Sequence, residues 1–165
     1  MYQRNSYCSW CGTPYQQSVW PRECAHCGNR IYLNPVPVVV VLVPVIGGLI
    51  GIRRNIEPCK GTITLPGGYL DLGESWQEGG KRELREETGI DLAEGDLKLY
   101  DALTGLDGTL LIFSLAGPQP AGILKPFSSK ETREVVLIDR PMELGFEMHT
   151  KVVARYFGEI EKGQG

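Results

Sequence analysis

Four of the five cysteines stand in two closely spaced pairs near the N-terminus. Cys8 and Cys11 form the first pair, Cys24 and Cys27 form the second, and a glycine directly follows each pair. Zinc prefers four ligands in a tetrahedron, and two thiolates separated by two residues on a tight turn can reach one ion together. The spacing therefore predicts a structural Zn²⁺ site made of all four thiolates, in a zinc ribbon over residues 1–34.

The same cysteines allow two other interpretations, a metal-free degenerate ribbon and a pair of disulfides. Disulfides are disfavoured because we expect a cytoplasmic protein, in which thiols stay reduced. His26 lies inside the second pair, but four thiolates already complete the zinc shell. Cys59 stands alone, and we expect it to be a free thiol without a role.

The charge of the cysteine-rich segment argues against a nucleic-acid partner. Residues 1–35 carry three arginines and one glutamate, and the whole chain has 17 basic and 20 acidic residues. Thiolates and one divalent ion would bring the segment close to neutrality, whereas nucleic-acid binding needs a basic surface. Five aromatic residues could stack on bases, but in so small a segment we expect them to form its core: Tyr7, Trp10, Tyr15, Trp20 and Tyr32.

A second segment with candidate functional residues, 66–90, joins a glycine-rich loop to a predicted helix that is rich in glutamate. Ser75 and Glu78 have the spacing of a capping box, and Gly89 is a natural C-terminal stop. We therefore expect a helix from Trp76 to Thr88.

Three glutamates of this helix fall on one side of it. At about 100° per residue, Glu83, Glu86 and Glu87 occupy an arc about 100° wide, on the side that carries Trp76. An ordinary solvated helix with an Arg82–Glu86 pair is the simpler interpretation, but it does not explain why Glu83 and Glu87 leave the solvated face. Clustered hard oxygens select Mg²⁺ or Mn²⁺, so a divalent-metal site is favoured.

The elements that position these residues point to an α+β fold. Apolar or alternating stretches predict strands, and Gly47-Gly48 and Asp107-Gly108 predict two hairpin turns. Helical spacing recurs from His149, and Gly158 is the expected stop of that helix. The predicted strands cover residues 38–43, 49–53, 98–103, 109–115 and 134–138.

Composition and length limit what the chain can be. Its 165 residues, 42% of them hydrophobic, suit one ordinary domain with a small appendage. The longest apolar run, Val38 to Ile50, is interrupted by proline and glycine and is shorter than the roughly 20 residues of a membrane-spanning helix. We expect no membrane association and a cytoplasmic location.

The carboxylate helix and its loop carry a resemblance to a known family. Gly68, Glu74 and the run from Arg82 to Ile90 match the fixed positions of the Nudix box. With the cysteine ribbon ahead of it, the chain resembles a Nudix subgroup that includes hydrolases of ADP-ribose, FAD and NADH. The resemblance implies an α/β/α sandwich with a mixed sheet over residues 35–165.

The resemblance also implies roles for individual residues. Glu86 and Glu87 would bind Mg²⁺ or Mn²⁺, and Glu83 would be a ligand, a base or both. Glu74 and Arg82 would pair to brace the loop against the helix. The family does not fix the general base, so Glu131 and Glu134 are candidates beside the interpretation of an ordinary exposed loop. Residues that would contact substrate are Gly67, Gly68 and Arg53.

The substrate remains open among several classes. An ADP-containing dinucleotide or ADP-ribose is the first expectation, and a nucleoside triphosphate is the second. A different class of function is a nucleic-acid-binding or protein-binding ribbon beside a vestigial Nudix site, which the complete set of glutamates disfavours. The acidic chain and neutral ribbon also disfavour mRNA decapping. Relatives commonly dimerise, so a homodimer is possible.

Overall fold

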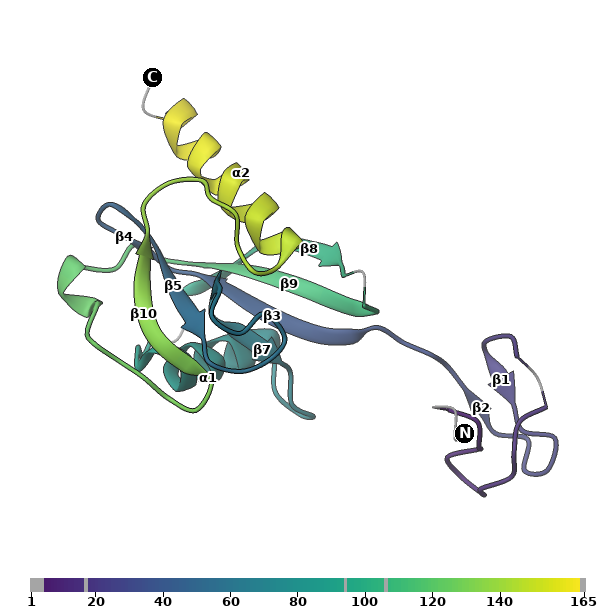
Figure 1. The fold of residues 1–165 in the computed structure, drawn as a ribbon. Coiled ribbons are helices and arrows are strands. Elements are labelled where there is room, and N and C mark those ends of the chain that lie inside the picture. Colours follow the sequence, from purple (N-terminus) through teal and green to yellow (C-terminus); the bar gives the residue numbers. More distant parts are fainter. Residues whose placement is uncertain (1–4, 17, 94, 106, 164–165) are drawn as a thin grey trace. The chain divides into compact units, whose positions relative to one another are not determined.

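The computed structural model of the 165-residue chain describes residues 5–16, 18–93, 95–105 and 107–163. Contacts between Cα atoms divide the chain into two compact units, Met1–Pro35 and Val36–Gly165. None of the described helices is both long enough and apolar enough to cross a membrane. Figure 1 shows the elements of each unit.

The first unit has a short antiparallel ladder between β1 (Arg22–Glu23) and β2 (Arg30–Ile31). The expected aromatic core is wrong for three of its members, because Tyr7, Trp10 and Tyr32 are 49%, 70% and 62% exposed. Tyr15 and Trp20 are half-buried, and their rings both lie against the Arg22 guanidinium. In the described part of this unit the buried hydrophobic side chains are those of Cys8 and Cys24.

The second unit is built on a four-stranded sheet with the strand order β7-β3-β9-β8. Its central pair, β3 (Val36–Leu42) and β9 (Thr109–Ala116), is parallel. The flanking strands β7 (Gly67–Tyr69) and β8 (Leu97–Thr104) run antiparallel to their neighbours. The sheet is therefore mixed, and the predicted hairpin between β8 and β9 is confirmed.

A second sheet has the order β10-β5-β4, with β6 (Ile63–Thr64) also paired to β5 (Gly48–Arg54). The predicted turn at Gly47 is confirmed, but its first arm is only β4 (Pro44–Val45). The predicted strand over residues 38–43 is not an arm of this hairpin, because β3 pairs with β7 and β9 in the other sheet. The other edge of this sheet is β10 (Thr132–Ile138).

Two helices cover opposite faces of the mixed sheet (Figure 1). Alternation along β3 explains this, since Val40 and Leu42 pack in the cluster of α2 (Glu147–Gly163), and Val41 packs with α1 (Trp76–Thr88). The α+β sandwich expected from the sequence is confirmed.

The predicted end of the second helix is wrong. This helix continues through Gly158 to Gly163. A single glycine inside a helix costs only about 1 kcal/mol, and the buried side chains of Val152, Val153 and Tyr156 anchor the helix on the sheet before that point. A short 3₁₀ turn at Ala121–Ile123 completes the elements of the described chain.

Candidate active site

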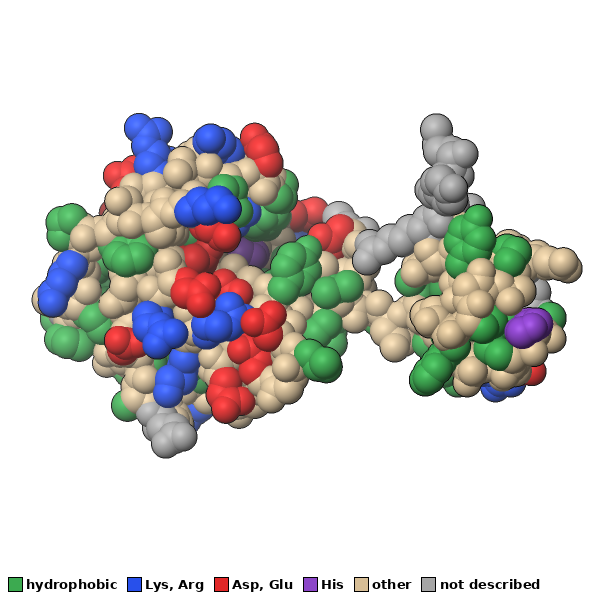
Figure 2. Space-filling view, turned by 90° about the horizontal axis from the view of Figure 1, so that it is seen from below, with side chains coloured by type: hydrophobic (Ala, Val, Ile, Leu, Met, Phe, Trp, Pro, Cys, Tyr) green, Lys and Arg blue, Asp and Glu red, His purple; other side chains and the backbone are tan. Residues whose placement is uncertain are grey.

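A cavity of about 630 Å³ opens on the α2 side of the mixed sheet. One part of the cavity is charged, and Figure 2, which views the molecule from below the orientation of Figure 1, shows acidic and basic side chains gathered side by side on the larger unit. Beside the charged part lies an apolar floor made by β3, β9, the start of α2 and the residues Leu65 and Phe146. The charged end is lined by Gly67, Gly68, Arg54, Arg82, Glu83, Glu86, Glu87 and Glu131, and the apolar part by Val38, Val40, Leu65, Leu111, Phe146 and Met148.

Local sequence places the carboxylates by fixing both ends of α1. Ser75 and Glu78 form the predicted capping box, in which each side chain meets the backbone N–H of the other residue. Gly89 ends the helix with φ of 72°, and its N–H donates to the Arg85 carbonyl. The predicted bounds of α1 are confirmed. Because the helix begins at the predicted residue, the predicted positions of its glutamates around the helix axis also hold.

Glu87 is a carboxylate almost without solvent. Its side chain is buried, and one carboxylate oxygen (Oε2) accepts a hydrogen bond of 2.8 Å from the Gly67 N–H. Burial raises the pKa of Glu87 to about 8, although the Gly67 hydrogen bond acts in the opposite direction. An anionic form of Glu87 therefore needs a cation beside it.

Glu83 lies one helical turn earlier, against the same glycine-rich strand. Its side chain is 13% exposed, and burial raises its pKa above the usual range. A Cβ atom added to Gly68 would lie 2.5 Å from the Glu83 carboxyl carbon. A side chain at position 68 would therefore displace the Glu83 carboxylate from this position.

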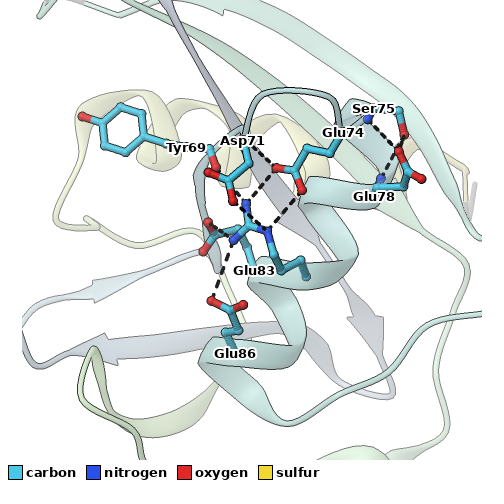
Figure 3. A network of polar contacts seen from close by, with 8 residues as sticks. Tyr69, Asp71, Glu74, Ser75, Glu78, Glu83 and Glu86 are labelled. Carbon is cyan, nitrogen blue, oxygen red and sulfur yellow. Dashed lines mark hydrogen bonds and ion pairs between the residues drawn. The ribbon is translucent and has the colours of Figure 1, made fainter.

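Arg82 links the loop to the helix through several carboxylates (Figure 3). Its Nε and Nη2 donate to the two Glu74 oxygens at 3.2 and 2.8 Å, and Nη2 also donates to the Tyr69 carbonyl at 3.0 Å. Its Nη1 lies 2.7 Å from Glu83 and 3.7 Å from Glu86. The hydrogen bonds that Glu74 accepts from Arg82 lower the pKa of Glu74 below its usual range. The sequence-predicted pair of Glu74 and Arg82 is present.

The three predicted metal ligands of α1 differ in exposure. Glu86 is 56% exposed, in contrast to the withdrawn Glu83 and Glu87. Ligand atoms of these glutamates do not form a compact set, since among described residues only the four-cysteine group has three or more candidate ligand atoms within 4.8 Å of one another. Arg82 instead lies in contact with both Glu83 and Glu86.

The donor chemistry at this end of the cavity nevertheless fits a divalent cation. Two carboxylates are withdrawn from water and have raised pKa values, which a nearby cation would reverse. Oxygen donors of this kind suit Mg²⁺, Mn²⁺ or Ca²⁺. The fit is to the cation class, because carboxylates alone do not select among these ions.

Of the two adjacent arginines at the end of β5, the structure brings Arg54 to the cavity and not Arg53. Arg53 donates to Glu134 at 2.6 Å and to the Gly61 carbonyl at 3.0 Å. Arg54 lies over the Phe146 ring, with its Nε bound to the Pro58 carbonyl. The cavity lining therefore does not support the prediction of Arg53 as a substrate contact, because neighbouring strand residues face opposite sides of a sheet.

The candidate bases separate in the same way. Glu131 lines the cavity, whereas Glu134 is bound to Arg53 on β10. His149 also lines the cavity and was missed in the sequence, where it appeared only as the start of a helix. A lone histidine carries no motif, and its position becomes visible only when α2 packs on the sheet.

The four cysteines of the first unit lie close together. The Sγ atoms of Cys8 and Cys27 are 3.7 Å apart, and those of Cys11 and Cys24 are 3.6 Å apart. The residue after each pair turns back, since the N–H of Gly12 donates to the Cys8 carbonyl and that of Gly28 to the Cys24 carbonyl. Four free thiols within 4.8 Å fit a tetrahedral Zn²⁺ ion.

The two residues that the sequence set aside from the zinc site lie outside it. His26 is exposed and is not a member of the four-cysteine group. Cys59 makes a contact with a segment distant in the sequence, because its Sγ donates to the Gly145 carbonyl at 3.0 Å.

Comparisons with known proteins agree with this architecture. A curated relative, the NAD-capped RNA hydrolase NudC of Salmonella typhi, is 29% identical over 91 residues, which span 54% of this chain and 35% of the relative. The chain therefore matches only about a third of the length of that relative.

Solved structures match over most of the chain. A NUDIX hydrolase from Nitrosomonas europaea aligns with a TM-score of 0.74 and 23% identity, covering 96% of this chain and 93% of the other. The NUDIX domain of Shewanella oneidensis NrtR, solved with ADP ribose, aligns with a TM-score of 0.63 and 15% identity, covering 76% and 88%. The sequence profile of the NUDIX domain matches residues 34–155. The chain belongs to the NUDIX domain family.

Proposed function

We propose that this chain is a pyrophosphohydrolase that uses a divalent cation to cleave a nucleoside diphosphate linked to another moiety. The observation that carries the proposal is the pair of withdrawn carboxylates, Glu83 and Glu87, packed against Gly68 and Gly67 at one end of a large cavity. Burying two carboxylates this close is unfavourable for a structural role alone. A cation bound there would offset the cost and attract a diphosphate.

In this proposal Glu83, Glu86 and Glu87 hold Mg²⁺ or Mn²⁺. Such an ion, when bound, would neutralise charge on the diphosphate and lower the pKa of the attacking water. Glu86, the exposed member, would turn from Arg82 towards the ion. Glu83 or Glu131 would accept the proton of the water, and both line the cavity.

The other residues at the charged end would hold the substrate and the loop. Gly67 and Gly68 line the cavity and would contact the diphosphate through their backbone. Arg54 replaces Arg53 as the proposed phosphate-binding arginine, because Arg54 lines the cavity and its Nη atoms donate to no acceptor among the described residues. Glu74 and Arg82 brace the loop against α1.

The shape of the cavity favours substrates with two different parts. Its charged end suits a diphosphate, and its apolar floor suits a nucleoside or a second ribosyl group. The Shewanella domain was solved with ADP ribose, and the Salmonella relative is named as a NAD-capped RNA hydrolase. ADP-ribose and dinucleotides such as FAD and NADH are therefore our first candidates, and nucleoside triphosphates are the second.

For the first unit we propose a zinc ribbon with a structural role, ending at about residue 34 and followed by the catalytic domain. The four thiols supply the ligands. Arg30 is paired with Glu23, and Arg22 is engaged by two aromatic rings, so little basic surface is free in the described part of this unit. The third arginine, Arg4, lies outside the described residues.

The proposal is tested by a substrate panel with the full chain. ADP-ribose, FAD, NADH, NAD, NAD-capped RNA, diadenosine polyphosphates and nucleoside triphosphates are each incubated with Mg²⁺ or Mn²⁺, and products are separated by chromatography. We expect cleavage within the diphosphate of ADP-ribose or a dinucleotide, abolished by chelation of the cation. Release of inorganic pyrophosphate from triphosphates alone would favour the second candidate, and no cleavage of any compound would contradict the proposal.

A further inference from the structure

His149 stands in the first turn of α2, where that turn lines the cavity. The residue is 6% exposed, and its ring contacts two aromatic rings. The Phe113 ring is 5.7 Å away at 80°, and the Phe146 ring is 5.1 Å away at 58°. These contacts fix the plane of the imidazole, so its nitrogens point in defined directions.

One ring nitrogen already has a partner. The backbone N–H of Leu65 donates to Nδ1 at 3.2 Å, which requires Nδ1 to carry no proton. The ring is neutral, because burial and the charge of Arg54 lower the pKa of His149 to about 3. In this tautomer Nε2 carries the proton, and it is the polar ring atom left to donate a hydrogen bond.

The register of the strands beneath the imidazole locates the ring relative to the cavity lining. Phe113, which contacts the ring, pairs with Val40, and Val40 pairs with Gly67, whose N–H binds Glu87. The next row along the sheet, Val38 and Leu111, is apolar floor. The imidazole therefore lies where the charged end meets the apolar part.

We propose that His149 is a specificity-determining residue, whose Nε2–H donates a hydrogen bond to an acceptor atom of the bound substrate, either a phosphate oxygen or a ring nitrogen of the base. The inference rests on the proposed function and goes beyond it by naming a recognition contact. A neutral donor in an apolar wall binds an acceptor and disfavours a donor or an apolar group at the same place.

Three variants separate this role from the support that His149 gives to Leu65. Asn places an amide oxygen near the Nδ1 position, so His149→Asn can keep the Leu65 hydrogen bond while the Nε2 donor is lost. Gln places an amide nitrogen near the Nε2 position, so His149→Gln restores a donor. His149→Phe removes both groups and keeps a ring. Val153→Ala, on a buried α2 residue that does not line the cavity, controls for lost packing.

The readout is steady-state hydrolysis of ADP-ribose with Mg²⁺, together with the melting temperature of each variant. We expect a KM about 5- to 10-fold higher for His149→Asn and His149→Phe, with kcat changed much less, as for the loss of one hydrogen bond. His149→Gln should recover part of the loss even if its melting temperature is lower. Val153→Ala should melt earlier with an unchanged KM.

Substrate analogues then identify the acceptor. If it is a base nitrogen, one of the 1-, 3- or 7-deazaadenine forms of ADP-ribose should raise the KM of the wild-type chain but not that of His149→Asn. If it is a phosphate oxygen, the penalty of His149→Asn should persist with an analogue of ADP-ribose that lacks the base. Wild-type KM values for His149→Asn on all these compounds would overturn the inference. If the wild-type chain hydrolyses none of these compounds, the result would instead contradict the proposed function.

Discussion

The four cysteines and the acidic side of α1 both suit cations, but the protein assembles them in opposite ways. The thiols lie within 4.8 Å of one another in a unit with exposed aromatic residues and little core. The glutamates sit on a capped helix in a unit with two buried apolar clusters, and they differ widely in exposure. Where metal ligands take the place of an apolar core, as the four thiols do, they must lie close together. Where an apolar core already holds the unit, as under α1, the ligands can lie further apart.

The largest expected effect concerns the first unit. Replacing Cys24, which is buried, with serine should abolish stoichiometric zinc and unfold residues 5–35, because structural zinc supplies about 10–16 kcal/mol in small zinc domains. Zinc content measured by atomic emission, and hydrogen exchange over both units, check this. Cys59→Ser is the matched control and should keep its zinc. If the first unit stays protected from hydrogen exchange without bound metal, its side-chain packing and not zinc stabilises its fold.

The second largest expected effect concerns the buried glutamate Glu87 of α1. Glu87→Gln should lower kcat on ADP-ribose by at least about 100-fold, because the amide cannot bind a cation as a carboxylate does. The melting temperature of the cation-free chain should stay the same or rise, since the neutral amide can still accept from Gly67 and avoids a buried charge. Glu161→Gln, an exposed α2 variant, is the control. A comparable fall in both variants would remove the special role of the buried acid.

Arg82 tests how the loop is held to the helix. Arg82→Lys loses the two parallel hydrogen bonds to Glu74 and the bond to the Tyr69 carbonyl, which a single ammonium cannot replace. We expect kcat/KM to fall about 10- to 100-fold. Arg85→Lys, on the exposed face of the same helix, should change it little. Equal activity in the two variants would contradict a bracing role.

The smallest effect separates the two neighbouring arginines. Arg54→Ala should raise the KM for ADP-ribose about 10-fold, since a charged donor to a phosphate is lost. Arg53→Ala removes an exposed pair with Glu134 and should leave KM unchanged, with stability lower by at most about 1 kcal/mol. The reverse order of KM effects would return the phosphate-binding role to Arg53.

Much of this architecture is predictable from local sequence signals. Ser75, Glu78 and Gly89 determine both ends of α1, and the spacing of the cysteine pairs predicts the sulfur cluster. These features depend on residues a few positions apart. Local spacing is therefore enough to place the glutamates and the thiols on their own elements.

The remaining features depend on contacts between distant segments. β3 pairs with β9, about 70 residues later in the chain, and not with the nearby β5. No local sequence pattern indicates this pairing. His149 joins the cavity only because α2 packs on Phe113. Arg54 rather than Arg53 faces the cavity because of the pairing of β5 with β10 and β6.

The central claim is that the buried glutamates of α1 hold a divalent cation at the cavity. Titration of the zinc-loaded chain with Mn²⁺, followed by electron paramagnetic resonance of the free ion, measures this directly. We expect wild-type protein to bind Mn²⁺, and Glu83→Gln and Glu87→Gln each to weaken it at least about 10-fold, while Glu161→Gln binds as wild type does. Equal Mn²⁺ affinity in all four proteins would contradict the claim.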